Sequence, residues 1–225
     1  MDKNILFETL VGSRLWHMHT LGSDYDYFKV YIAPLYDVLI GKEYKKSFDR
    51  KEKSLGSAIG NDVEYHEIGK VVDMLIKGNI NFMVGVFSQR GLNLEEYETN
   101  PYQYEIQAIC STPCKNLYHS CHGLAKGNYE RYILSGKEDT PKKRGQIYRV
   151  LVLLENYLVH GKLYFNPVDA DHATNEHIDE LLERTTRLYD ESEYPEKPLW
   201  EEDLKDWLAR LRIKKGVSLS INDRG

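Results

Sequence analysis

Apolar and polar residues alternate along the first part of the chain in a way that predicts β-strands. Residues 27–32 alternate and are rich in aromatic and β-branched side chains, which favours a strand that Pro34 should end. Residues 4–11 are an apolar run before Gly12, compatible with a short strand or with a last helical turn. Residues 61–70 alternate again and predict another strand.

Helical spacing of the apolar residues follows this second alternating stretch. Over 71–76 it predicts a helix that stops at the Gly-Asn pair 78–79. The broad apolar face of 142–160 predicts the longest helix, which Gly161 should end. Further amphipathic patterns predict helices over 174–192 and 199–213.

Bulk composition narrows the class of protein. The chain has 225 residues and a net charge of −5, which argues against general affinity for nucleic acid and leaves room for a local basic groove. No apolar run is long enough to cross a membrane, and the first residues do not resemble a signal peptide. Three cysteines, an odd number, fit a reducing compartment. We therefore expect a cytoplasmic protein with no membrane partner.

Two short motifs near the start of the chain carry the candidate chemistry. Gly12 and Ser13 form a turn in which backbone N–H groups and a hydroxyl can approach a phosphate. Asp24 and Asp26 stand one residue apart, so on a strand they would project from one face. Paired carboxylates repel each other unless a cation lies between them, and Mg²⁺ prefers such oxygens. Each motif alone is common in ordinary loops and strands, whereas their combination indicates a nucleoside-triphosphate site.

The spacing of these motifs resembles a known family. A G-S pair, an S-D-x-D motif and the segment Tyr27–Pro34 are similar to the DNA polymerase beta superfamily of nucleotidyltransferases, in particular to its predicted branch with a GS…SDxD motif. Lys29 departs from that branch, which usually has a small residue there. The resemblance covers roughly residues 5–165 and leaves the acids of the motif intact.

The resemblance implies a role for each residue of the two motifs. Gly12 and Ser13 would hold the β- and γ-phosphates of a nucleoside triphosphate, and Ser23 would be a further nucleotide-binding residue. Asp24 and Asp26 would coordinate two Mg²⁺ ions that bridge those phosphates.

Residues further along the chain complete the implied site. A third carboxylate on an adjacent strand would bind one metal ion; Asp62 is the first candidate, and Glu64, two residues on and on the same face, competes with it. Lys142 and Arg149 match a cationic pattern of the family and are candidates for phosphate contact, although cations opposite an apolar helix face are ordinary.

Two other clusters have both a functional and an ordinary interpretation. The basic segment 42–54 is either a solvated loop or a loop that closes over a phosphate-bearing substrate. The cysteines and histidines of 110–122 are zinc ligands by type, but their spacing is not that of a zinc knuckle, and buried thiols are the alternative. The polar residues 89–104 predict a surface connection, and 162–165 predict a closing strand.

Pattern and resemblance together predict an α+β fold. A small mixed sheet flanked by helices would form a nucleotidyltransferase core over 1–100, and a mainly helical region over 101–225 would complete the nucleotide and acceptor cleft.

The expected activity is magnesium-dependent transfer of a nucleoside monophosphate from a nucleoside triphosphate to an acceptor hydroxyl, with release of pyrophosphate. RNA or transfer RNA is the favoured acceptor, a protein is less favoured, and the base preference is open. Two alternatives remain at this point: a non-catalytic nucleotide-binding sensor or antitoxin-like regulator on the same fold, and a two-metal phosphoesterase.

Overall fold

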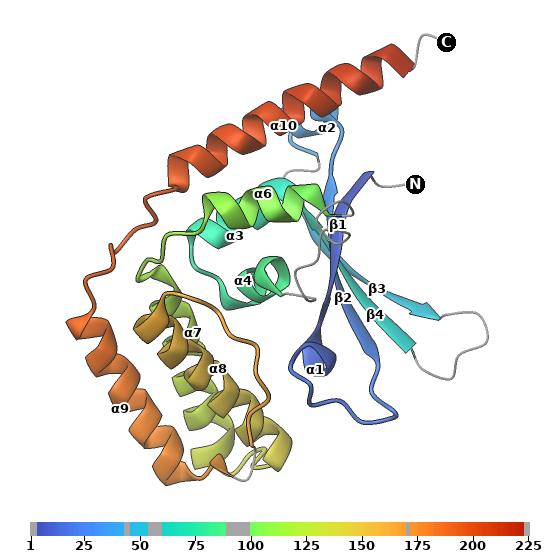
Figure 1. Cartoon of the computed structure of the whole chain (residues 1–225). Coiled ribbons are helices and arrows are strands. Elements are labelled where there is room, and N and C mark those ends of the chain that lie inside the picture. Colours follow the sequence, from blue (N-terminus) through green and yellow to red (C-terminus); the bar gives the residue numbers. More distant parts are fainter. Residues whose placement is uncertain (1–3, 43–45, 54–59, 89–99, 170–171, 223–225) are drawn as a thin grey trace.

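A mixed four-stranded sheet forms one side of the molecule (Figure 1). The computed structural model describes residues 4–42, 46–53, 60–88, 100–169 and 172–222. The strands are β1 (Asn4–Val11), β2 (Tyr25–Ile32), β3 (Ser47–Lys53) and β4 (Gly60–Glu67), in the order β1-β2-β4-β3. The β2-β4 pair is parallel, whereas β1-β2 and β3-β4 are antiparallel. The predicted strand at 27–32 is thus confirmed and starts two residues earlier, and the run before Gly12 is a strand.

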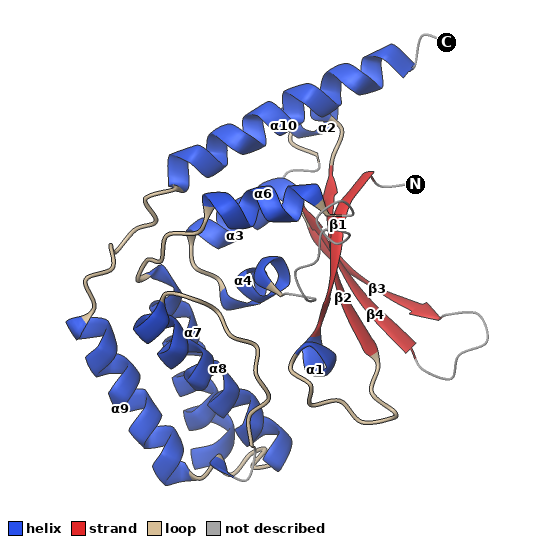
Figure 2. Ribbon diagram, viewed as in Figure 1, coloured by secondary structure: helices blue, strands red, loops and turns tan. Residues whose placement is uncertain are grey.

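Helices make up most of the remainder of the chain (Figure 2). Short helices α1 (Gly12–Leu15) and α2 (Leu35–Leu39) flank β2 in the sequence. The others are α3 (Ile68–Ile76), α4 (Ile80–Phe87), α6 (Pro101–Ile109), α7 (Asn116–Asn128), the π-helix η1 (Tyr129–Leu134), α8 (Pro141–His160), α9 (Asn175–Glu191) and α10 (Glu201–Asn222). The α+β class is confirmed.

Local sequence accounts for the ends of the helices that frame the site. Glu67 caps α3 by accepting a hydrogen bond from the Gly69 amide at 2.6 Å, and Asn79 caps α4. Thr140 caps α8, which ends at Gly161 in a left-handed conformation, φ 69°. These caps set the starts of α3 and α4 and both ends of α8. The helix α8 was expected to be the longest, but its 20 residues are fewer than the 22 of α10.

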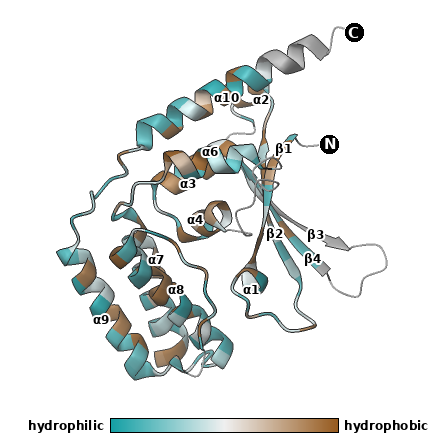
Figure 3. Cartoon of the chain, viewed as in Figure 1, coloured by the Kyte–Doolittle hydropathy of each residue, from teal (hydrophilic) through white to brown (hydrophobic). Residues whose placement is uncertain are grey.

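The helices are arranged in layers against the sheet. Figure 1 shows α3, α4 and α6 on one face of the sheet, α7, α8 and α9 packed beside one another, and α10 extending across the sheet end of α3 and α6. Hydrophobic residues concentrate in α3 and α4, while the part of α10 that is coloured is largely hydrophilic (Figure 3). Among the described residues, none of the helices has both the length and the apolar character that a membrane crossing requires.

One hydrophobic core joins the sheet to the helical region. It runs from Phe7 and Val30 on the strands through Leu117 on α7 and Leu154 on α8 to Trp207 on α10, all of them buried. A second, smaller cluster lies between α7, η1, α8 and α9. Residues before and after position 100 therefore share packing, which holds the helical region in a fixed place beside the sheet.

A buried ion pair ties α10 to the sheet. The Arg212 Nη2 lies 2.8 and 3.0 Å from the two carboxylate oxygens of Glu67, the last residue of β4. Glu67 is 0% exposed and also accepts hydrogen bonds from the amides of Gly69 and Ala33. The charge at the end of the sheet is thus compensated by a residue far along the chain.

Three expectations from the sequence need correction. The segment 47–53, expected to be a loop, is strand β3, because pairing with β4 satisfies the backbone of a polar segment. Of the expected surface connection over 89–104, residues 89–99 lie outside the described residues, and 101–104 belong to helix α6. Residues 162–165, expected to be a strand, run as irregular backbone and pair with no strand in the described part of the chain.

Candidate active site

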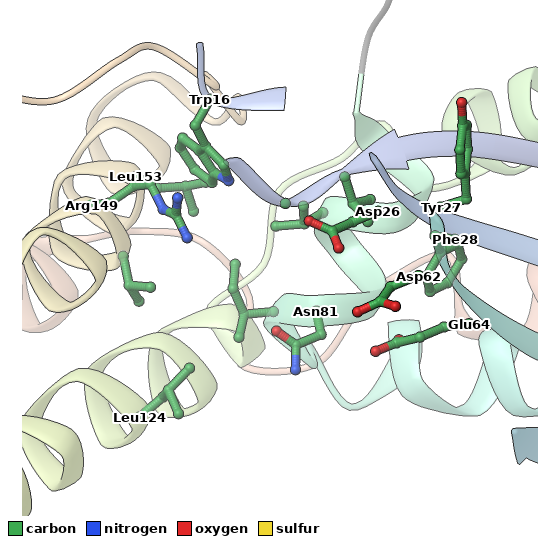
Figure 4. Close-up of a pocket in the computed structure, with 15 residues that line it drawn as sticks. Trp16, Asp26, Tyr27, Phe28, Asp62, Glu64, Asn81, Leu124, Arg149 and Leu153 are labelled. Carbon is green, nitrogen blue, oxygen red and sulfur yellow. The ribbon is translucent and has the colours of Figure 1, made fainter. Parts of the chain in front are cut away.

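The parallel pairing of β2 and β4 brings the candidate acids together. Asp26 is the register partner of Asp62, and Phe28 is the partner of Glu64. Register partners and alternate residues of a strand project from the same face, here the face that α4 covers. Figure 4 shows the carboxylates of Asp26, Asp62 and Glu64 side by side at one wall of a pocket.

These acids line a cavity of about 370 Å³ between the sheet and the helical region. The remaining wall is mostly apolar and comes from α4, α7 and α8. The lining residues are Val11, Gly12, Trp16, Asp26, Tyr27, Phe28, Asp62, Glu64, Ile80, Asn81, Val84, Leu124, Arg149, Val150 and Leu153. The cavity thus joins residues of the predicted core and of the helical region.

Gly12 is pressed against the Asp26 carboxylate. Its backbone is left-handed, φ 66°, and a Cβ at this position would overlap the Asp26 side chain. The close approach explains why a glycine stands at the start of the turn. It also fixes the backbone of α1 beside the acid.

Replacing Gly12 by alanine is expected to damage the site more than the fold. The left-handed backbone would cost about 1–2 kcal/mol, and displacement of Asp26 would lower transfer on the order of 10²-fold. Urea unfolding and a transfer assay measure the two effects. Gly22→Ala is the matched control, because nothing lies within 4 Å of its added Cβ. Equal activities of the two variants would contradict this account of Gly12.

Burial and the charges of neighbouring carboxylates both act on the acids of the site. Burial, followed by the charges of Asp62, Asp24 and Glu64, raises the pKa of Asp26, and Arg14 opposes the shift. The pKa of Glu64 is lowered, chiefly by its hydrogen bond to His66, whose Nε2 lies 3.3 Å away. The site therefore concentrates negative charge around Asp26 and favours a bound cation there.

The raised pKa of Asp26, due to burial first and to neighbouring carboxylates second, predicts that Asp26→Asn stabilises the metal-free protein at neutral pH. A raised pKa means that the folded chain holds the proton more tightly than the unfolded chain, so folding stability falls as pH rises through that window. The asparagine variant should have the higher urea midpoint at pH 7 in chelator, and the difference should shrink at pH 4 and below. A variant that is less stable than wild type at pH 7 would contradict the claim that the folded protein disfavours a charged Asp26.

Arg149 faces the acids from the opposite wall. Its guanidinium lies 4.5 Å from the centre of the Trp16 ring, and Figure 4 shows both side chains across the cavity from Asp26. Burial lowers the pKa of Arg149 to about 10. The cavity therefore has an acidic wall and a cationic wall, a charge pattern suited to a metal-bound polyphosphate.

The other predicted site residues lie outside the cavity lining. Ser13 is in the first turn of α1, and its carbonyl accepts from the Met18 amide. The Ser23 hydroxyl accepts from the Thr20 amide at 2.9 Å. Asp24 is exposed, one residue before β2, and Lys142 is exposed in the first turn of α8. Asp24 still raises the pKa of Asp26 through its charge, so the two acids are near each other.

Sequence reasoning missed three residues at the site. Trp16 and Asn81 line the cavity, and Arg14 acts on Asp26 through its charge. Arg14 also donates hydrogen bonds to the carbonyls of Ser23 and Asp24 and so holds the turn before β2. Their nearness to the motifs was the available signal: Arg14 and Trp16 come within three residues of the G-S pair, and Asn81 is in the first turn of the helix that follows the Gly-Asn pair.

The donor set fits magnesium better than zinc. Among the described residues no three His, Cys, Asp or Glu side chains are placed to hold a metal ion by themselves. Mg²⁺ is commonly bound by one or two carboxylates together with water and substrate phosphates, which the neighbouring acids Asp26 and Asp62 can supply. The thiols Cys110, Cys114 and Cys121 are buried, and burial raises the pKa of each. They pack in the hydrophobic core.

The expected basic segment 42–54 is described only in part. Residues 43–45 and 54 lie outside the described residues, as do the side chains of Arg50, Lys51 and Lys53. Its role toward a substrate stays a prediction.

Comparison with known proteins identifies a family. The model of the RlaP family, described as an RNA repair pathway DNA polymerase beta family, matches residues 1–218. A search of curated proteins found no match.

Proposed function

The chain belongs to the RNA repair pathway DNA polymerase beta family, and we propose that it transfers a nucleoside monophosphate from a nucleoside triphosphate to an acceptor hydroxyl. The family supports a nucleotidyltransferase-like role. The observation that carries the finer proposal is the pair Asp26 and Asp62 on parallel neighbouring strands, in a cavity that Arg149 closes on the other side.

The acids are the proposed ligands of magnesium. Asp24 and Asp26, together with Asp62, would hold two ions, and Glu64 is the alternative third carboxylate. When bound, the ions neutralise the phosphates and lower the pKa of the attacking hydroxyl. Repulsion around Asp26 supports this assignment, because a cation relieves it.

The chain's own residues position the nucleotide. Gly12 brings the backbone of the turn against Asp26, and Ser13 and Ser23 are proposed nucleotide-binding residues near it. Arg149 would donate hydrogen bonds to phosphate oxygens and offset charge on the leaving pyrophosphate, with Lys142 as a second candidate cation. In the reaction the acceptor oxygen bonds to the α-phosphorus while the bond from that phosphorus to pyrophosphate breaks.

RNA is the proposed acceptor. The description of the family as one of an RNA repair pathway supports this choice, and a 3′ or internal ribose hydroxyl is a nucleophile that such a site can use. The net charge of −5 confines any attraction for RNA to local contacts rather than to the whole surface.

Label transfer tests the proposal. Each of the four α-labelled ribonucleoside triphosphates is incubated with magnesium and with total RNA or total protein. We expect label in the RNA fraction from wild type and none from the Asp24→Asn/Asp26→Asn double variant. Tight triphosphate binding without label in either fraction would favour a sensor or regulator.

A further inference from the structure

Arg149 is held in an unusual environment for a cation. Its Nε is buried and has no hydrogen-bond partner among the described residues, and no ion pair is recorded for it there. Its guanidinium carbon lies over the face of the Trp16 indole, 4.5 Å from the ring centre. A buried guanidinium normally satisfies its donors, so the unpaired Nε indicates that this side chain is arranged for a ligand.

Trp16 is a rigid support for that guanidinium. It is 5% exposed and packs edge-on against Phe165, with ring centres 5.2 Å apart. Phe165 lies in the segment that follows α8. The indole of Trp16, which directly follows α1, is therefore held against the chain on the far side of α8. His17, the next residue, has a left-handed backbone, φ 53°, which turns the chain away directly after the indole.

We propose that Trp16 is a positioning residue that holds the Arg149 guanidinium toward the polyphosphate of the bound nucleotide. An arginine side chain has many rotamers, and stacking on an indole fixes the plane of the guanidinium while leaving its edge free to donate. Fixing it before binding removes an ordering cost from each phosphate contact. This inference rests on the proposed function.

The arrangement also links the two halves of the chain through the ligand. Trp16 follows the same turn that places Gly12 against Asp26, whereas Arg149 belongs to α8. A polyphosphate bound at both walls would therefore contact Arg149 directly, and it would contact the acids through bound metal. The indole sets how far the cation reaches across the 370 Å³ cavity.

A double-mutant cycle tests the role of Trp16. The variants are Trp16→Leu, Arg149→Ala and their combination, and the probe is inorganic tripolyphosphate with magnesium, titrated by calorimetry. We expect Trp16→Leu to weaken binding about 3- to 10-fold, Arg149→Ala about 10- to 100-fold, and the combination within about 2-fold of Arg149→Ala alone.

A structural role for Trp16 gives a different result. If Trp16→Leu weakens binding by the same factor with and without Arg149, the indole does not act through the cation and the inference is overturned. If wild type itself does not bind tripolyphosphate, it is the proposed function that fails. The two failures are distinguishable.

Two milder variants keep the test valid if Trp16→Leu does not fold. Trp16→Phe retains an aromatic face and should bind within about 3-fold of wild type. Arg149→Lys keeps the charge but loses the planar group, and should bind about 5-fold more weakly. If Arg149→Lys binds tripolyphosphate as tightly as wild type, the inference is overturned. A positive charge that cannot stack on the indole as a planar group would then be sufficient for binding.

Discussion

Replacing Asp26 by asparagine is expected to lower the rate of nucleotide transfer on the order of 10³-fold, the scale seen when a key electrostatic group of an active site is removed. The charges of three other carboxylates raise the pKa of Asp26, which lies between the backbone of Gly12 and its strand partner Asp62. An amide cannot supply the charge that a cation needs at this point. The rate is measured from an α-labelled triphosphate at saturating magnesium.

Glu8→Gln is the matched control for this experiment. Glu8 is on the neighbouring strand β1, is exposed and pairs with Lys29 at 2.9 Å, and its register places it on the opposite face of the sheet. Its loss removes a carboxylate without touching the cavity, so transfer should stay within about 2-fold of wild type, as for surface changes generally. Undiminished transfer by Asp26→Asn would remove the proposed mechanism.

Replacing Arg212 by alanine is expected to destabilise the protein by about 3–5 kcal/mol, because Glu67 would be left charged and buried without its partner. Glu67 ends β4, caps α3 and receives both contacts from Arg212, so the loss affects the junction of sheet and helices. Urea unfolding measures the change in the free energy of unfolding.

Two further variants interpret that result. Arg210→Ala changes an exposed arginine of the same helix and should shift the free energy of unfolding by at most about 0.5 kcal/mol. Glu67→Gln/Arg212→Met removes both charges and should recover part of the loss. If Arg212→Ala is as stable as Arg210→Ala, the ion pair does not hold α10 to the sheet.

Local sequence patterns were sufficient to predict those helices and strands that are determined by their own residues. The alternation of 27–32 identified β2, and the apolar face and flanking Thr140 and Gly161 determine α8. The polar strand β3 had no such signal. It pairs with β4 through backbone hydrogen bonds, which do not depend on the type of side chain. The segment 162–165 had a strand-like sequence, but among the described residues it pairs with none of the strands of the sheet.

The candidate site was predictable on one side only. The S-D-x-D motif indicated the acidic wall, and the strand register then brings Asp62 opposite Asp26. The expectation that Asp24 and Asp26 act from one strand face did not allow for a strand that starts at Tyr25, after a turn held by Arg14. The opposite wall depends on packing between distant elements, so Trp16 beside Arg149 could not be read from spacing.

The position of the label in the nucleotide tests the central claim most directly. Two reactions, with α-labelled and with γ-labelled triphosphate, are run with magnesium and a defined single-stranded RNA. The account predicts that α-label enters the RNA while γ-label leaves as pyrophosphate in equal amount, and that both signals vanish in Asp26→Asn. Release of labelled orthophosphate or free nucleoside monophosphate without labelled RNA would contradict it and identify a phosphoesterase.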